Sequence, residues 1–145
     1  MKFKFFLLFA VALGLLAIFG YFQAVGRGTP PDQKTSKPKI VVEPEQWDFG
    51  EIEYGKIAEY TFKVRNTGSE TLEIKRVATS CACTSAKIDK EKIGPGGTAE
   101  ILVTYDTAAM GRGSHGKGKQ ERIIYVKSND PENPQVQVKI YANIY

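Results

Sequence analysis

The segment Tyr60-Thr61-Phe62-Lys63-Val64-Arg65 alternates apolar and polar side chains with a period of two. Successive side chains of a β-strand point to opposite faces of a sheet, so this alternation predicts a strand with one buried and one solvated face. The same pattern recurs in residues 72–77, 99–105, 124–126 and 136–140. No stretch after Arg27 has a helical periodicity, so the rest of the chain is expected to be all-β.

Turn signals separate the predicted strands. They are Asn66-Thr67-Gly68, Gly94-Pro95-Gly96-Gly97 and Asn129-Asp130-Pro131, which combine the residues that β-turns favour. About seven short strands with such turns between them are typical of an immunoglobulin-like antiparallel β-sandwich. We therefore expect one β-sandwich domain over residues 40–145.

The amino-terminal segment predicts a membrane association. Lys2 and Lys4 precede an apolar run over residues 5–22, which as a helix would span about 27 Å, close to the thickness of a bilayer core. Two interpretations remain open for residues 1–26: an uncleaved transmembrane helix, or a signal helix cleaved near Ala24-Val25-Gly26. Either one exports the domain, and the first makes a single-pass protein of the cell membrane with its domain on the periplasmic or extracellular side.

Composition restricts the class of partner. Residues 27–39 are rich in Pro, Gly and polar side chains, which is typical of a flexible linker. The whole chain carries a formal charge of +4, but without Lys2 and Lys4 the remaining 18 basic residues face 16 acidic ones. A nearly neutral chain with no clustered basic stretch argues against nucleic acid as a partner.

Several ordered motifs carry a resemblance to a known family. They are Trp47-Asp48-Phe49-Gly50, residues 62–68, Ser80-Cys81-Ala82-Cys83-Thr84 and residues 126–131. Over roughly residues 42–144 the chain resembles the bacterial domain-of-unknown-function family 1573, an envelope family with a Hydin-like immunoglobulin-type domain and a small-Cys-x-Cys-Thr motif. The resemblance implies an immunoglobulin-like sandwich and export, and it implies no activity. The segment 108–119 departs from it by its length.

The chain has only two cysteines, Cys81 and Cys83. In an extended strand their side chains point to one face and their Cα atoms lie about 6.6 Å apart, so a disulfide between them requires a bulge or a turn and would be strained and easily reduced. The first interpretation is structural: a packed thiol pair, or a local disulfide in an oxidising compartment.

Two chemical interpretations stand beside the structural one. The two thiolates can form half of a Cu(I) site, with His115 and Met110 as weaker candidates for the missing ligands. Alternatively, the pair exchanges with other thiols, which requires positive charge beside a thiolate. Arg76 and Lys87 are the basic residues close to the pair in sequence.

Other polar residues give no catalytic constellation. Ser80, Thr84 and Ser85 have no histidine near them in sequence, and Asp106 and Asp130 follow strands as turn formers do. The basic residues from Arg112 to Arg122 are interleaved with glycine. They could contact an anionic lipid or polymer, but a solvated loop is the preferred interpretation.

We therefore expect a non-catalytic extracytoplasmic binding or structural module of the bacterial envelope. The expected partner is another envelope protein, met through an edge strand or a loop end. The alternative is a copper-binding or thiol-redox protein that uses Cys81 and Cys83.

Overall fold

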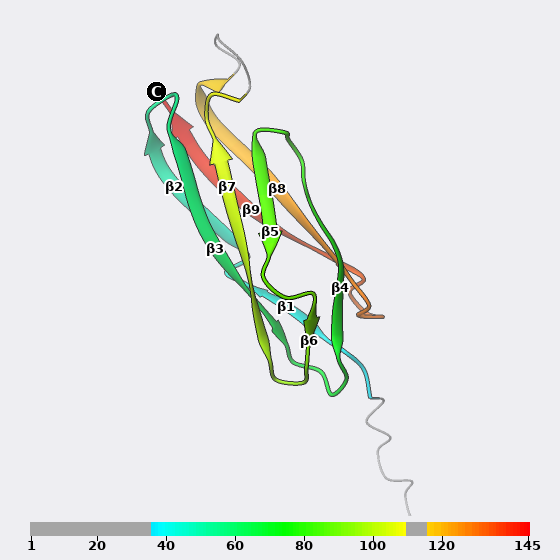
Figure 1. Cartoon of the computed structure of the whole chain (residues 1–145). Helices are drawn as coiled ribbons and strands as arrows, with labels where there is room; N and C mark the ends of the chain where they lie inside the picture. Colours follow the sequence, from blue (N-terminus) through cyan, green and yellow to red (C-terminus); the bar gives the residue numbers. More distant parts are fainter. Residues whose placement is uncertain (1–35, 110–115) are drawn as a thin grey trace, which may run out of the picture. The chain divides into compact units, whose positions relative to one another are not determined.

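A computed structural model describes residues 36–109 and 116–145, which fold into two β-sheets (Figure 1). No α-helix occurs in these two ranges, so the all-β prediction is confirmed. Neither range holds a helix long and apolar enough to cross a membrane. The apolar run 5–22 and most of the linker 27–39 lie outside the described residues, so the predictions made for them stay predictions.

The two sheets divide the strands into a group of four and a group of five. The first sheet has the order β1-β3-β7-β5 and the second has the order β2-β9-β8-β4-β6. The strands are β1 (Ile40–Glu43), β2 (Gln46–Ile52), β3 (Ile57–Asn66), β4 (Leu72–Thr79), β5 (Thr84–Ile88), β6 (Lys92–Ile93), β7 (Thr98–Asp106), β8 (Gly118–Ser128) and β9 (Gln135–Ile144). This is the two-sheet sandwich that the turn spacing predicted.

Two details of the prediction were wrong, the number of strands and their uniform antiparallel pairing. β1 pairs antiparallel with β3, but the chain then crosses at Pro44 to the other sheet, where β2 pairs parallel with β9. Residues 40–52 thus supply an edge strand to each sheet, β1 to the first and β2 to the second. The two-residue strand β6 adds a further short pairing with β4.

Alternation along each strand fills the space between the sheets. Phe62 and Ile101 from the first sheet and Ile124 and Ile140 from the second are at most 1% exposed. Burial of a side chain of this size contributes roughly 1.5–3 kcal/mol, so these inward-facing rows supply the main driving force for folding. The core predicted from alternation is confirmed.

One end of the sandwich is closed by two buried polar side chains, and we call it the Asn66 end. The amide nitrogen of Asn66 donates to the carbonyls of Glu70 (2.7 Å) and Ile93 (2.9 Å), and its oxygen accepts from Gly68 N–H at 3.0 Å. Asp130 accepts from the backbone N–H groups of Ile40, Glu132 and Asn133 at 2.9, 2.8 and 3.1 Å.

The charge of Asp130 is stabilised by these backbone donors. Burial alone would raise the pKa of its carboxyl, but the hydrogen bonds from Ile40, Asn133 and Glu132 outweigh burial and lower the pKa below its ordinary value. Asp130 is therefore a structural anion that fixes the start of β1, in agreement with its prediction as a turn former.

Candidate functional site

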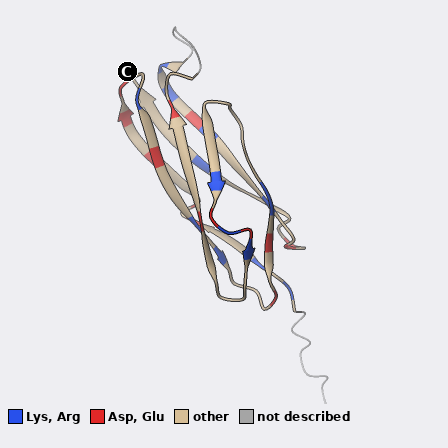
Figure 2. Cartoon of the chain, in the orientation of Figure 1, with Lys and Arg blue, Asp and Glu red and all other residues tan. Residues whose placement is uncertain are grey.

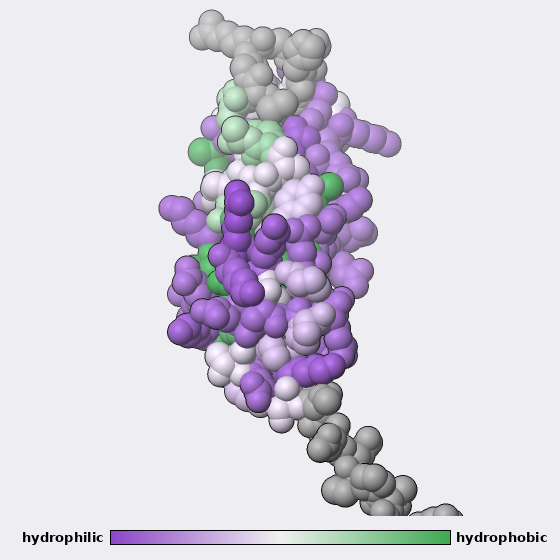
Figure 3. Space-filling view, turned by 90° about the vertical axis from the view of Figure 1, so that its right-hand side faces the viewer, coloured by the Kyte–Doolittle hydropathy of each residue, from purple (hydrophilic) through white to green (hydrophobic). Residues whose placement is uncertain are grey.

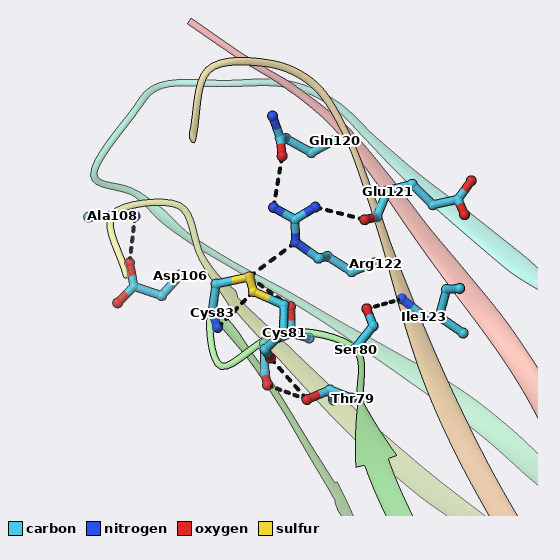
Figure 4. Close-up of a disulfide and its surroundings, with 11 residues drawn as sticks. Thr79, Ser80, Cys81, Cys83, Asp106, Ala108, Gln120, Glu121, Arg122 and Ile123 are labelled. Carbon is cyan, nitrogen blue, oxygen red and sulfur yellow. Dashed lines mark hydrogen bonds between the residues drawn. A yellow bond between two sulfur atoms is a disulfide. The ribbon is translucent and has the colours of Figure 1, made fainter. Parts of the chain in front are cut away.

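Cys81 and Cys83 lie at the opposite end of the sandwich, which we call the cysteine end. They belong to the turn between β4 and β5, where the chain passes from the second sheet to the first (Figures 1 and 4). The two residues form a disulfide with their Cα atoms 5.2 Å apart. The sequence argument required a bulge or a turn for a disulfide at this spacing, and the structure has a turn there.

Hydrogen bonds from both sides hold this turn in place. The Thr79 hydroxyl lies 3.1 Å from the carbonyl oxygen of Cys81 and 2.8 Å from that of Thr84. Ser80 joins the turn to β8, because its backbone N–H donates to the Ile123 carbonyl (2.9 Å) and its hydroxyl accepts from Ile123 N–H (3.0 Å). The turn is therefore fixed against β8, the strand that carries the next functional side chain.

The two cysteine residues differ in exposure. Cys83 is 3% exposed and belongs to the hydrophobic core, whereas Cys81 is half-buried and packs against the edge of that core. The backbone N–H of Cys83 donates to Sγ of Cys81 at 3.0 Å, and the carbonyl of Cys83 accepts from Asp106 N–H at 2.9 Å. A reagent from solvent therefore has better access to Cys81 than to Cys83.

Arg122 of β8 contacts the buried sulfur. Its Nε–H donates to Sγ of Cys83 at 3.1 Å, as Figure 4 shows. Its two terminal nitrogens donate to the side-chain oxygen of Gln120 and to the carbonyl of Glu121, both at 2.7 Å. Three hydrogen bonds thus fix the orientation of the guanidinium toward the disulfide.

The guanidinium packs against the end of the core and is partly exposed. Its carbon lies 5.5 Å from the centre of the buried Tyr105 ring, a cation–π arrangement. Burial raises the pKa of the Tyr105 hydroxyl, and the positive charge of Arg122 partly opposes that rise. Among the residues that the structure describes, no carboxylate forms an ion pair with Arg122. Its charge is therefore directed at the ring and the sulfur.

Sequence reasoning missed Arg122 by assigning it to a solvated glycine-rich loop. The ladder from Gly118↔Ile144 to Lys127↔Gln135 makes it part of a long strand instead, because β8 pairs along its whole length with β9. Arg122 is two and four residues from the buried Ile124 and Val126, so it occupies an inward-facing position. A charged residue in the register of a buried row was the signal in the sequence.

The remaining sequence candidates have different outcomes. Met110 and His115, the weaker Cu(I) ligands, lie outside the described residues. Within residues 36–109 and 116–145, no group of three or more His, Cys, Asp or Glu side chains is arranged to hold a metal ion. Arg76 lies exposed on β4 and Lys87 lies exposed on β5. Among the described residues, the basic side chain that contacts the disulfide is Arg122.

A second feature of interest is the edge of β3, part of which no described strand covers. β1 pairs with β3 only as far as Glu43↔Lys63, because the chain then leaves for the other sheet. The N–H of Thr107 donates to the carbonyl of Lys56, and the β3–β7 register continues from this pair. The backbone groups of even-numbered β3 residues therefore point toward β7. Those of Ile57, Glu59 and Thr61 therefore face the open edge, beyond the end of β1.

Aromatic side chains lie beside this open edge. Trp47 of β2 stacks on Tyr60 of β3 with ring centres 4.0 Å apart, and Tyr60 meets Phe62 edge-on at 4.9 Å. Trp47 is 38% exposed and Ile57 is 63% exposed. Figure 2 shows acidic residues on both β2 and β3; Glu59 lies on β3 at this edge, whereas Asp48 and Glu51 of β2 line a hollow over β2, β8 and β9. The open edge thus combines apolar surface with the carboxylate of Glu59.

Two other large apolar side chains of the described residues are exposed, Leu102 at 43% and Tyr145 at 63%. Figure 3 shows a face that is mainly hydrophilic, with a hydrophobic patch toward the same end as the β4–β5 turn. A hollow of about 290 Å³ lies over β2, β8 and β9, and polar side chains including Asp48, Glu51, Lys119 and Asn143 line it. This hollow contains no cluster that indicates a reaction.

Solved structures with a similar fold come from bacteria and from humans. A protein of unknown function from Porphyromonas gingivalis W83 matches with a TM-score of 0.67 and 22% identity over 80% of this chain and 51% of its own. A PapD-like domain of human CEP192 matches with 0.56 and 12% over 83% and 95%. The E. coli chaperone DraB matches with 0.51 and 9% over 72% and 54%.

These likenesses show an immunoglobulin-like, PapD-like fold. The chain spans about half the length of the Porphyromonas protein. No curated protein sequence matches the chain. The model of one family does match, over residues 40–144, which is most of the chain and includes both β-sheets and the Cys81–Cys83 turn. The chain therefore belongs to DUF1573, a family described as protein of unknown function.

Proposed function

We propose that the domain is a non-catalytic binding module of the bacterial envelope that takes an extended segment of another envelope protein along the open edge of β3. The observation that carries this proposal is the early end of β1. It leaves the N–H and C=O groups of Ile57, Glu59 and Thr61 facing outward in line with an existing strand. An added strand would continue the ladder that β1 begins.

The surroundings of this edge define the segment that fits it. Three outward-facing residues at alternate positions extend over about 13 Å of strand, enough for a short peptide. Trp47 and Ile57 offer exposed apolar contacts, and the carboxylates of Glu43 on β1 and Glu59 on β3 lie beside the edge. We expect a segment in which apolar residues alternate with basic ones.

The fold is compatible with this role. DraB, one of the proteins with a similar fold, is a chaperone, and a chaperone binds other proteins. The likeness concerns the fold alone, so the argument for binding rests on the β3 edge of this chain.

Export of the domain is part of the proposal. Disulfides persist in oxidising compartments, so the Cys81–Cys83 bond supports a periplasmic or extracellular position for the domain. Residues 5–22 would hold it at the cell membrane and residues 27–39 would serve as a tether. Protease added to intact spheroplasts should then digest the domain, whereas a cytoplasmic position would protect it.

Trp47 provides the signal for a binding experiment, because it is the only tryptophan in the chain. We would titrate the full-length chain, in non-ionic detergent, with a synthetic peptide of about ten residues in which valine and lysine alternate. Binding at the β3 edge should change the Trp47 fluorescence and should weaken as salt is added.

Two proline variants give this experiment its control. Thr61→Pro removes an outward N–H from the β3 edge, and Ala86→Pro removes one from β5, the opposite edge of the same sheet. We expect Thr61→Pro to weaken binding about tenfold or more, as the loss of hydrogen bonds at that edge requires. Equal affinity of both variants and the natural chain would refute binding at β3.

A further inference from the structure

We propose that the Cys81–Cys83 disulfide exchanges with dithiols of other exported proteins, and that Arg122 assists by stabilising the departing thiolate of Cys83. This activity goes beyond strand binding and uses the other end of the sandwich. It rests on three observations: a very short disulfide loop, cysteine residues of unequal exposure, and a guanidinium directed at the sulfur of the buried Cys83.

The short loop argues against a purely stabilising role. A disulfide stabilises a protein mainly by restricting the unfolded chain, and this effect grows with the length of the loop that it closes. Cys81 and Cys83 are separated by two positions in sequence, so their bond restricts the unfolded chain very little. The turn is also held without it, through Thr79, Ser80 and the backbone of Asp106.

The unequal exposure gives the reaction a direction. A thiolate of the partner attacks Sγ of the half-buried Cys81, because Cys83 is only 3% exposed. A bond forms between the partner's sulfur and Cys81, the Cys81–Cys83 bond breaks, and its electron pair remains on Sγ of Cys83. The product is a mixed disulfide at Cys81 and a thiolate at Cys83.

A second thiolate completes the exchange. It belongs to the same partner and attacks the partner's sulfur in the mixed disulfide, which expels Cys81 as a thiolate. The partner has then lost two electrons and two protons and carries a new disulfide. The domain has gained the two electrons as two cysteine thiolates, which take up protons from solvent. The reverse sequence reduces a partner disulfide, so the partner's potential decides the direction.

Arg122 acts at the first step. A thiol leaves more easily when its thiolate is stabilised, and Nε–H of Arg122 already lies 3.1 Å from Sγ of Cys83. The other titratable groups that the structure places beside this pair are Tyr105 under the guanidinium and Asp106, whose carboxylate accepts from Ala108 N–H at 2.9 Å. Among the described residues, the charged side chain that contacts the sulfur of Cys83 is thus the positive Arg122.

The experiment measures reduction of the folded full-length chain by dithiothreitol, followed by acid quenching, alkylation of free thiols and mass spectrometry. Arg122→Gln should lower both the rate of reduction and the equilibrium constant about tenfold, the effect of losing one charge-assisted hydrogen bond. Arg122→Lys, which keeps the charge, should recover part of the loss. Arg76→Gln removes an exposed arginine from the neighbouring strand and should behave as the natural chain.

A second pair of variants tests which sulfur is attacked. Cys83→Ser leaves Cys81 free and should form a mixed disulfide readily with oxidised glutathione, whereas Cys81→Ser should react at least tenfold more slowly at the buried Cys83. Gln120→Ala releases one hydrogen bond of the guanidinium and should slow reduction less than Arg122→Gln, so it serves if Arg122→Gln does not fold.

Two results would overturn the proposal. One is a rate of reduction that is equal in the natural chain, Arg122→Gln and Gln120→Ala. The other is a disulfide that dithiothreitol reduces only at denaturant concentrations where the domain unfolds. Neither result would affect binding at the β3 edge, which the Trp47 titration tests separately.

Discussion

The Asn66 end and the cysteine end of the sandwich both pack polar side chains against the core, but they use them differently. At the Asn66 end, Asn66 and Asp130 are at most 1% exposed and their hydrogen bonds go to nearby backbone groups. At the cysteine end, Arg122 brings a positive charge against a ring and a disulfide, without a carboxylate partner among the described residues. The first end is a closed network, and the second directs a charge at a reactive bond.

This difference indicates a structural role for the Asn66 end and a chemical role for the cysteine end. A buried polar group that is completely hydrogen-bonded to backbone contributes to one fixed conformation. A cation fixed beside a sulfur atom attracts it most strongly when that sulfur is a thiolate, which forms only if the disulfide opens. The comparison therefore predicts that changes at the Asn66 end affect stability and that changes at the cysteine end affect reactivity.

The largest loss of stability should follow Asn66→Ala. This change leaves the carbonyls of Glu70 and Ile93 and the N–H of Gly68 without their partner, and buried groups of this kind cost about 1–3 kcal/mol each when orphaned. We expect a loss of about 3 kcal/mol in the free energy of unfolding, measured by urea denaturation. Asn143→Ala, on β9, should change it by less than about 0.5 kcal/mol. Equal effects would remove the structural role of the Asn66 end.

Asp130 should give a smaller loss that depends on pH. Its pKa is lower in the folded chain, so its contribution is complete above the unfolded pKa near 3.8 and is lost as pH falls through the folded pKa. The free energy of unfolding should therefore fall below about pH 4. Asp130→Asn should cost roughly 2 kcal/mol at pH 7 and should flatten this acid decline. An unchanged acid decline in the variant would assign it to other carboxylates.

The double change Cys81→Ser, Cys83→Ser should have the smallest effect on stability. The entropy of closing so short a loop corresponds to about 1.5 kcal/mol. Urea denaturation should show a loss no larger than this, while exchange with thiols disappears completely. A loss as large as that of Asn66→Ala would make the disulfide a structural element and would remove the contrast between the two ends.

The fold was largely predictable because alternation reports local burial. Phe62 and Val64 alternate with Lys63 in the sequence, and the sandwich buries the first two and exposes the third. The parallel pairing of β2 with β9 was not predictable, because Trp47 and its partner Ile140 are far apart in sequence and alternation does not specify a partner.

The site was predictable only in part. The two cysteines were found from composition, but the turn that joins them depends on strands β4 and β5 belonging to different sheets. Arg122 was missed because the glycines before it favoured a loop, whereas pairing with β9 from Gly118 onward overrides that local preference. The inward register that Arg122 shares with Ile124 was available in the sequence and is the more reliable signal.

The central claim is that the cysteine end can change its redox state while the Asn66 end remains folded. Amide hydrogen exchange of the full-length chain, measured by mass spectrometry before and after native reduction with dithiothreitol, tests it most directly. The account predicts complete reduction with faster exchange confined to peptides around residues 79–84 and 118–122, and unchanged protection around Asn66. Reduction that occurs only together with loss of protection around Asn66 would contradict it.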